Sequence, residues 1–138
     1  MDLIGRKGLA RNINGTDAML VIPQLRQTRE TYEPELWALF MREVRPGDYV
    51  ADVGAHHGLY TIAIAKRVRD GGKVIAFEPQ PENFEVLRAQ VALNRISGSV
   101  TLEKLALSRA PGEVSFNDQS VQSSIATGPT GGDRKSVV

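Results

Sequence analysis

Two acidic residues and a pair of histidines surround a glycine-containing turn in this sequence. The run VADVGAHHGLYT spans residues 50–61, with Asp52 just before Gly54 and Gly58, and Glu78 follows 26 residues after Asp52. Residues of these types suit three kinds of site. They fit a metal centre, a histidine-based catalytic centre, or a backbone turn shaped to hold a ligand.

The two histidines, His56 and His57, do not form a convincing metal or catalytic site. They are the only histidines in the chain, cysteine is absent, and no nearby acid completes a set of ligands. We expect their adjacent side chains to point to different sides of the backbone. A histidine base also needs an orienting partner, and the sequence names none. We therefore predict no metal site here, and the catalytic residues stay unknown.

A backbone turn that holds a ligand explains the pattern better. Gly54 lets the chain turn sharply where a strand ends, and Gly58 is expected to leave room for a ligand against the next helix. The start of that helix offers free N–H groups and the positive end of a dipole. Asp52 is able to accept a hydrogen bond or pair with a cation, and Glu78 is able to accept hydrogen bonds from two ribose hydroxyls. The open alternatives are plain turn glycines and a solvated acid at a strand end.

The identity of the nucleoside follows from the glycine spacing. A dinucleotide fingerprint needs glycines at positions 54, 56 and 59, but the chain has His56 and Leu59. This disfavours a nicotinamide-dependent oxidoreductase. A ligand with a ribose, a carboxylate and an ammonium group fits the two acids better, and S-adenosyl-L-methionine is such a ligand.

The elements that must position these residues alternate along the chain. Apolar periodicity, prolines at helix starts and glycine turns predict helices and short strands in the order helix, strand, helix, strand, helix, strand, over residues 31–44, 49–55, 58–69, 73–79, 81–95 and 100–107. Short connections between consecutive strands indicate right-handed crossovers and a parallel sheet. We expect Trp37 and Tyr60 to pack in the core, because both lie on apolar helix faces.

The two ends of the chain carry weaker signals. Residues 1–30 read as an N-terminal extension with an edge strand at 19–25, because proline is tolerated at a sheet edge. Residues 31–117 form the expected α/β core, with a last short strand near 112–117. Residues 118–138 read as a loop, most mobile over 119–134, that leads into the start of another strand.

Composition narrows the class of protein. The net charge of +1, the lack of a basic block and the absence of a long apolar run predict no nucleic acid partner and no membrane partner. The first residues are charged where a signal peptide would be apolar. We therefore expect a cytoplasmic protein.

The segments DVGAHHGLYT, VIAFEPQPENFEVLRAQVALN, VTLEKLALS and GEVSF resemble the FkbM family of S-adenosylmethionine-dependent methyltransferases. The resemblance implies a Rossmann-like α/β fold, with helices on both faces of a parallel sheet of strand order 3-2-1-4-5-7-6. It places Pro79 near the adenine, with Ala106 and Leu107 on the other side. It also matches Thr61 to a hydroxyl position and Asn83 to a helix start. The implied cofactor-binding residues are Asp52, Gly54, Ala55, His56, Gly58, Thr61, Glu78, Pro79, Ala106 and Leu107.

The sequence departs from that family where it ends. Family members continue with an Asp-bearing fourth strand and three further strands, so this sequence looks truncated before strand four. The resemblance implies methylation of a hydroxyl on a sugar or polyketide-like molecule, although this fragment alone is expected to be inactive. The alternative is a non-catalytic cofactor-binding fragment. Without strand four, we also expect self-association through the exposed edge of the strand at 49–55.

Overall fold

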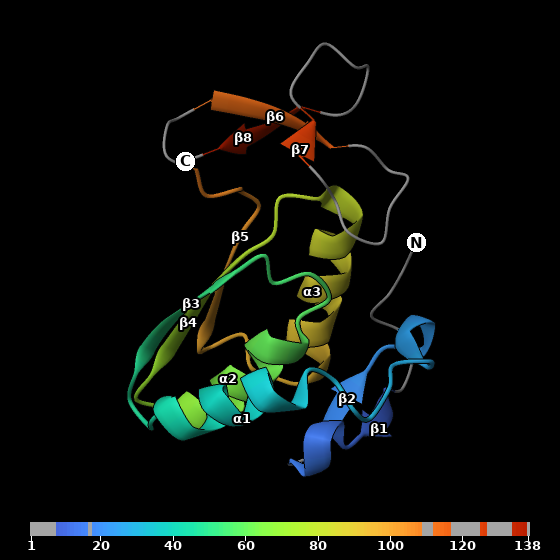
Figure 1. The fold of residues 1–138 in the computed structure, drawn as a ribbon, viewed down its shortest axis with the longest axis vertical. Helices are drawn as coiled ribbons and strands as arrows, with labels where there is room; N and C mark the ends of the chain where they lie inside the picture. Colours follow the sequence, from blue (N-terminus) through green and yellow to red (C-terminus); the bar gives the residue numbers. More distant parts are fainter. Residues whose placement is uncertain (1–7, 17, 109–111, 117–124, 127–133, 138) are drawn as a thin grey trace.

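The computed structural model places a three-stranded parallel sheet at the centre of the chain, in the order β3-β4-β5 (Figure 1). Its strands are Tyr49–Val53, Lys73–Phe77 and Val100–Glu103. Asp52 pairs with Ala76 across the first two strands. This confirms the predicted parallel sheet, although β5 ends four residues earlier than expected. The structure describes residues 8–16, 18–108, 112–116, 125–126 and 134–137.

The helices follow the predicted pattern closely. They are α1 (Pro34–Glu43), α2 (Leu59–Val68) and α3 (Pro81–Leu93), and α2 and α3 are the crossovers between the parallel strands. A proline in the first turn suits α1 and α3, because its fixed φ matches the helix and its missing N–H has no helical partner there. The side chain of Gln80 caps α3 by accepting a hydrogen bond from the Asn83 N–H at 2.6 Å.

The described helices cover one face of the sheet. Ile64 of α2 and Leu87 of α3 are buried in one cluster with Val74 and Ala76 of β4. On the opposite face apolar side chains are open to solvent, with Tyr49 79%, Val53 57% and Ile75 42% exposed. The expectation of helices on both faces is thus met on one face within the described chain. Strand β3 is one of the two edge strands of the described sheet, and its outer face has no cover among the described residues.

An antiparallel hairpin precedes the sheet. It consists of β1 (Leu9–Arg11) and β2 (Met19–Val21), with 3-10 helices η1 (Ile13–Gly15) and η2 (Pro23–Leu25). The strand expected over 19–25 is confirmed for its first three residues, but its partner is β1 and Pro23 begins η2 instead.

Side chains of α3 hold this hairpin in place. Gln90 Oε1 accepts a hydrogen bond from the Ile22 N–H at 2.8 Å. Asn94 bonds both the N–H and the carbonyl of Leu20, at 2.9 and 2.8 Å. These hydrogen bonds join residues that are 68 and 74 positions apart in the sequence.

A second small sheet follows the core. Strand β6 (Gly112–Phe116) pairs antiparallel with both β7 (Ile125–Ala126) and β8 (Arg134–Val137). The predicted strands near 112–117 and at the end of the chain are therefore present. Apart from β7, most of the loop expected over 119–134 lies outside the described residues. In the described ranges, no fourth parallel strand lies beside β3, and no helix has the length and apolar character that crossing a membrane requires.

Candidate functional site

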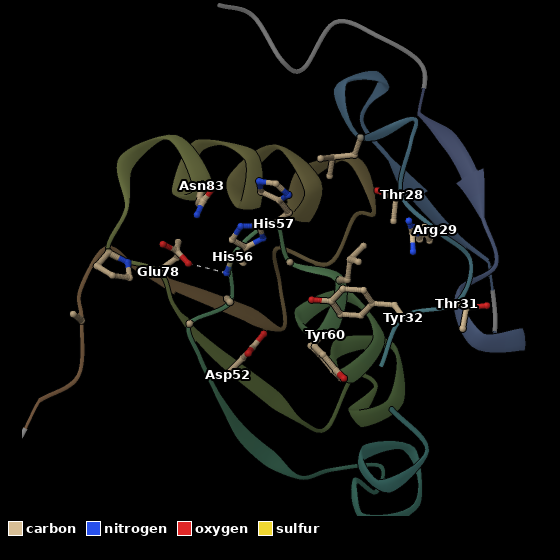
Figure 2. Close-up of a pocket in the computed structure, with 17 residues that line it drawn as sticks. Thr28, Arg29, Thr31, Tyr32, Asp52, His56, His57, Tyr60, Glu78 and Asn83 are labelled. Atoms are coloured by element: carbon tan, nitrogen blue, oxygen red, sulfur yellow. Dashed lines mark hydrogen bonds between the residues drawn. The ribbon is translucent and has the colours of Figure 1, made fainter. Parts of the chain in front are cut away.

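A cavity of about 700 Å³ lies where β3 and β4 end and the chain turns toward α2 and α3 (Figure 2). This is the usual place for a ligand in an open parallel α/β sheet, at the carboxyl ends of the strands. Eight of the ten predicted site residues line it, namely Asp52, Gly54, Ala55, His56, Gly58, Glu78, Pro79 and Ala106. Asn83, matched to a helix start, lines it as well. Thr61 and Leu107 lie outside the lining.

Glu78 is the most firmly held acid of the cavity. It is only 5% exposed, and each of its carboxylate oxygens accepts a backbone hydrogen bond. Oε2 accepts from the His56 N–H at 2.8 Å, and Oε1 accepts from the Gln80 N–H at 2.9 Å. An ionised carboxylate has about four acceptor positions, so both oxygens retain capacity for a ligand. The backbone therefore fixes the carboxylate in place.

The turn between β3 and α2 has an unusual backbone. Gly54, His56 and Gly58 have φ values of 76°, 52° and 87°. The N–H groups of Gly54 and Ala55 both donate to the carbonyl of Phe77 at 2.9 Å. The turn is thereby tied to the end of β4.

The two glycines of this turn have different roles. A Cβ on Gly54 would meet no atom within 4 Å, so this position opens onto free space. A Cβ on Gly58 would lie 2.6 Å from Cδ1 of Leu87. The expectation that Gly58 leaves room for a ligand is therefore wrong, because helix α3 occupies that room. Gly58 permits close packing of α3 against the turn.

Asp52 is positioned by a residue behind it. The buried Thr61 hydroxyl, in the first turns of α2, donates to Asp52 Oδ2 at 2.5 Å. Burial raises the pKa of Asp52 above its ordinary value, and the Glu78 charge adds to the rise while the Thr61 hydrogen bond opposes it. Thr61 therefore acts on the cavity through Asp52.

The two histidines lie against each other. Their ring centroids are 3.9 Å apart, so the expectation that they point to different sides is wrong. The left-handed backbone at His56 breaks the alternation that an extended chain would have. Burial, followed by the neighbouring His56, lowers the pKa of His57 to about 4. Within the described ranges, no three His, Cys, Asp or Glu residues gather as metal ligands would.

One whole side of the cavity was not predicted from the sequence. This side, called the N-terminal wall, consists of Leu25, Thr28, Arg29, Thr31 and Tyr32. Figure 2 shows Thr28, Arg29 and Tyr32 across the cavity from Glu78. The segment has no strand or α-helix between η2 and α1, so periodicity gives no signal for it.

Tyr60 connects the wall to the core. The centroid of its ring lies 4.9 Å from the ring centroid of the buried Trp37 and 6.0 Å from that of Tyr32. Its hydroxyl donates to Glu33 Oε2 at 3.1 Å. The expectation of a core role is confirmed for Trp37, whereas Tyr60 packs on the core and also lines the cavity.

The cavity has the size and the mixed polar and apolar lining of a small-molecule site. Its volume lies within the range of roughly 300–1,000 Å³ that is usual for small-molecule sites. Glu78 offers acceptors for ribose hydroxyls, Gly54 leaves open space, and Pro79 and Ala106 offer apolar surface for a base. Leu107, matched to the adenine end, is 44% exposed and lies outside the lining.

Comparison with known proteins agrees with this geometry. The sequence model of the methyltransferase FkbM domain matches residues 52–137. Over 72 residues the chain is 39% identical to 31-O-demethyl-FK506 methyltransferase FkbM of Streptomyces tacrolimicus, a match that covers 52% of this chain and 27% of that protein. The chain thus spans about a quarter of that relative's length.

A solved structure shows the same fold. A SAM-dependent O-methyltransferase from Thermotoga maritima superimposes with a TM-score of 0.51 at 23% identity, covering 59% of this chain and 31% of that one. This likeness supports the fold, a Rossmann-like α/β methyltransferase arrangement. The family match covers well over half of the chain. The chain therefore belongs to the FkbM family of methyltransferases.

Proposed function

We propose that this chain forms the cofactor-binding part of an S-adenosylmethionine-dependent methyltransferase that methylates a hydroxyl group of a small molecule. The observation that carries the proposal is the buried carboxylate of Glu78, which two backbone N–H groups fix at the cavity. When bound, S-adenosylmethionine supplies an electrophilic methyl group on a sulfonium. The task left to the protein is to align that group with the acceptor and to exclude water.

The cavity residues divide this task. The carboxylate of Glu78 accepts hydrogen bonds from the two ribose hydroxyls. Gly54 leaves space for the ligand beside the backbone. Pro79 and Ala106 lie against the adenine. Asp52, at the end of β3, pairs with the ammonium of the amino-acid end.

The acceptor is assigned from the relative. Its name describes a methyltransferase that acts on 31-O-demethyl-FK506, and this favours a hydroxyl on a polyketide-like or sugar molecule as the acceptor here. The match covers 27% of that relative, so the choice of acceptor is part of the proposal. A cytoplasmic location and the lack of a nucleic acid partner stay predictions of the sequence.

A second reading is a non-catalytic cofactor-binding unit. It rests on the exposed outer face of the sheet, which leaves β3 without a second layer in the described chain. Methyl transfer from labelled S-adenosylmethionine to a polyketide or sugar hydroxyl separates the two readings. Binding without transfer supports the second reading.

Calorimetry with S-adenosylhomocysteine tests the cofactor assignment. We expect the chain to bind it more tightly than NAD, because the turn lacks the dinucleotide fingerprint. Replacing Glu78 by Ala removes both ribose hydrogen bonds and should weaken binding by about 1.5–3 kcal/mol. Glu82→Gln is the matched control, since Glu82 is exposed on α3 and does not line the cavity. Unchanged affinity in a folded Glu78→Ala chain contradicts the assignment.

A further inference from the structure

The N-terminal wall contributes one cation to the cavity. Among the described residues that line the cavity, Arg29 is the only lysine or arginine. Its side chain is exposed, and no ion pair joins it to another described residue. Arg29 also precedes the region of family similarity, which begins at residue 52. The family match therefore says nothing about its role.

The charges of the cavity match those of a ligand with two different ends. The lining holds the carboxyl groups of Asp52 and Glu78 and the guanidinium of Arg29. The amino-acid end of S-adenosylmethionine or S-adenosylhomocysteine carries one carboxylate and one ammonium group. With Glu78 at the ribose, Asp52 and Arg29 are left as an anion and a cation for these two groups.

The positions of these groups agree with the order of groups along such a ligand. Figure 2 shows Glu78 and Arg29 on opposite sides of the cavity, with His56 beside Glu78 and Asp52 below them in this view. A ligand that places its ribose at Glu78 and its adenine at Pro79 extends its amino-acid end away from both. That direction leads toward the N-terminal wall, the side of the cavity that holds Arg29.

We propose that Arg29 binds the carboxylate of the cofactor's amino-acid end. This inference rests on the proposed function, because it takes S-adenosylmethionine as the ligand. A guanidinium is suited to the role, since its planar donors pair with both oxygens of a carboxylate and it stays charged at any physiological pH. Arg29 is thus a binding residue that lies outside the glycine turn and the strand ends.

Backbone contacts on both sides of Arg29 hold it at the cavity. On one side, Nη2 of Arg11 donates to the carbonyl of Arg26 at 2.7 Å. On the other side, the Asn14 N–H donates to the carbonyl of Glu30 at 2.6 Å. The side chain of Asn14 also bonds the carbonyl and the N–H of Tyr32, at 2.5 and 2.9 Å. The wall is therefore formed before a ligand arrives, which lowers the entropy lost on binding.

Three ligands separate the carboxylate contact from the rest of the site. S-adenosylhomocysteine has the whole amino-acid end, its decarboxylated analogue keeps only the ammonium, and 5′-methylthioadenosine lacks both groups. Calorimetry should show that Arg29→Gln lowers the affinity of the chain for S-adenosylhomocysteine by about 10- to 100-fold, as expected for a charged hydrogen-bonded pair. The affinities for the other two ligands should stay unchanged. Arg29→Lys should fall between, because it keeps the charge but loses the paired donors.

Arg26→Gln is the matched control, because Arg26 lies in the same segment but does not line the cavity. It should bind all three ligands like the parent chain. The proposal is overturned if Arg29→Gln leaves S-adenosylhomocysteine binding unchanged, or if it weakens all three ligands equally. If the parent chain binds S-adenosylhomocysteine and only Glu78→Ala weakens it, the proposed function stands while this inference fails. If the parent chain does not bind it at all, both fail.

Discussion

The backbone N–H of His56 donates a 2.8 Å hydrogen bond to Oε2 of Glu78. This bond joins the turn after β3 to the acid after β4, so two separate strand ends form one site. The left-handed backbone of His56, with a φ of 52°, sets the direction of its N–H. The shape of the turn and the position of the acid therefore depend on each other.

The first prediction concerns the backbone of position 56. The left-handed backbone destabilises the folded chain by about 1–2 kcal/mol when the residue is not glycine. Glycine avoids this cost, but its greater freedom in the unfolded chain costs about 0.5–1 kcal/mol. His56→Gly should therefore leave the free energy of unfolding unchanged or raise it by about 1 kcal/mol. His56→Pro should lower it by about 3 kcal/mol or more, because it removes the N–H and forces a negative φ. Urea unfolding measures both changes, and a large loss in His56→Gly contradicts the argument.

The second prediction compares the two glycines of the turn. Alanine at either position adopts an unfavourable positive φ, which costs about 1–2 kcal/mol. At Gly58 the new Cβ also meets Leu87, and such overpacking costs about 1–3 kcal/mol more. Thermal unfolding should therefore show a greater loss for Gly58→Ala than for Gly54→Ala.

A double variant tests the cause of that difference. If Leu87 is the obstacle, Gly58→Ala combined with Leu87→Ala should lose less stability than the sum of the two single changes. Additive losses show that the backbone alone is responsible.

The central fold could be predicted from the sequence because its signals are local. Prolines at 34 and 81 fix helix starts, and short apolar runs between glycine turns fix β3 and β4. Asp52 and Glu78 lie at the ends of neighbouring parallel strands, and the carboxyl ends of such strands meet at one edge of a sheet. The parts of the site that depend on chain order were therefore predictable.

The N-terminal wall could not be predicted in this way. It is held by the side chain of Asn14 at Tyr32, and the hairpin that carries Asn14 is itself held by Asn94 at Leu20. The hairpin strands have three residues each, too few for a periodic pattern. The Asn14–Gly15 pair is a turn signal, but it does not show which segment the Asn14 side chain will bind. The role of Gly58 was missed for the same reason, since only the packing of α3 reveals Leu87.

The third prediction concerns the pH dependence of stability. The pKa of His57 falls from its ordinary 6.5 to about 4 in the folded chain, so the unfolded chain binds more protons between these values. The free energy of unfolding should decrease as the pH falls from about 6.5 to about 4. His57→Gln should show a smaller decrease. The raised pKa of Asp52 makes the free energy of unfolding change with pH in the opposite direction. This contribution is present in both proteins, so the difference between their two pH curves reports on His57.

Urea titrations at several pH values measure this difference. Parallel curves for the parent chain and His57→Gln contradict the assignment of the lowered pKa to His57.

The fourth prediction concerns the support of Asp52. The hydroxyl of Thr61 lowers the pKa of Asp52 by stabilising its charged form, against the larger effect of burial. Thr61→Val removes this donor and should raise the pKa of Asp52 further, while Thr61→Ser should leave it close to the parent value. Carbon-detected NMR titration of the Asp52 carboxyl measures both. Equal pKa values in the valine and serine variants contradict this role of Thr61.

The last prediction concerns the outer side of the sheet. Within the described chain, β3 pairs only with β4, so its other edge presents unpaired N–H and carbonyl groups. The adjoining face exposes Tyr49, Val53 and Ile75. An unpaired edge beside an apolar face favours pairing with another strand, and the same edge of a second copy supplies one by a two-fold rotation. We therefore expect the chain to self-associate through β3.

Sedimentation velocity tests this expectation over a range of concentrations. The average sedimentation coefficient should rise with concentration for the parent chain. The double variant Val53→Lys with Ile75→Lys should sediment as a monomer, because it places charges on the exposed face beside the strand edge. Both side chains are already half exposed, so the melting temperature should change little.

Leu39→Lys is the matched control, since Leu39 is comparably exposed on α1, and it should associate like the parent. A parent chain that stays monomeric at every concentration, or a double variant that associates like Leu39→Lys, shows that β3 is not the contact.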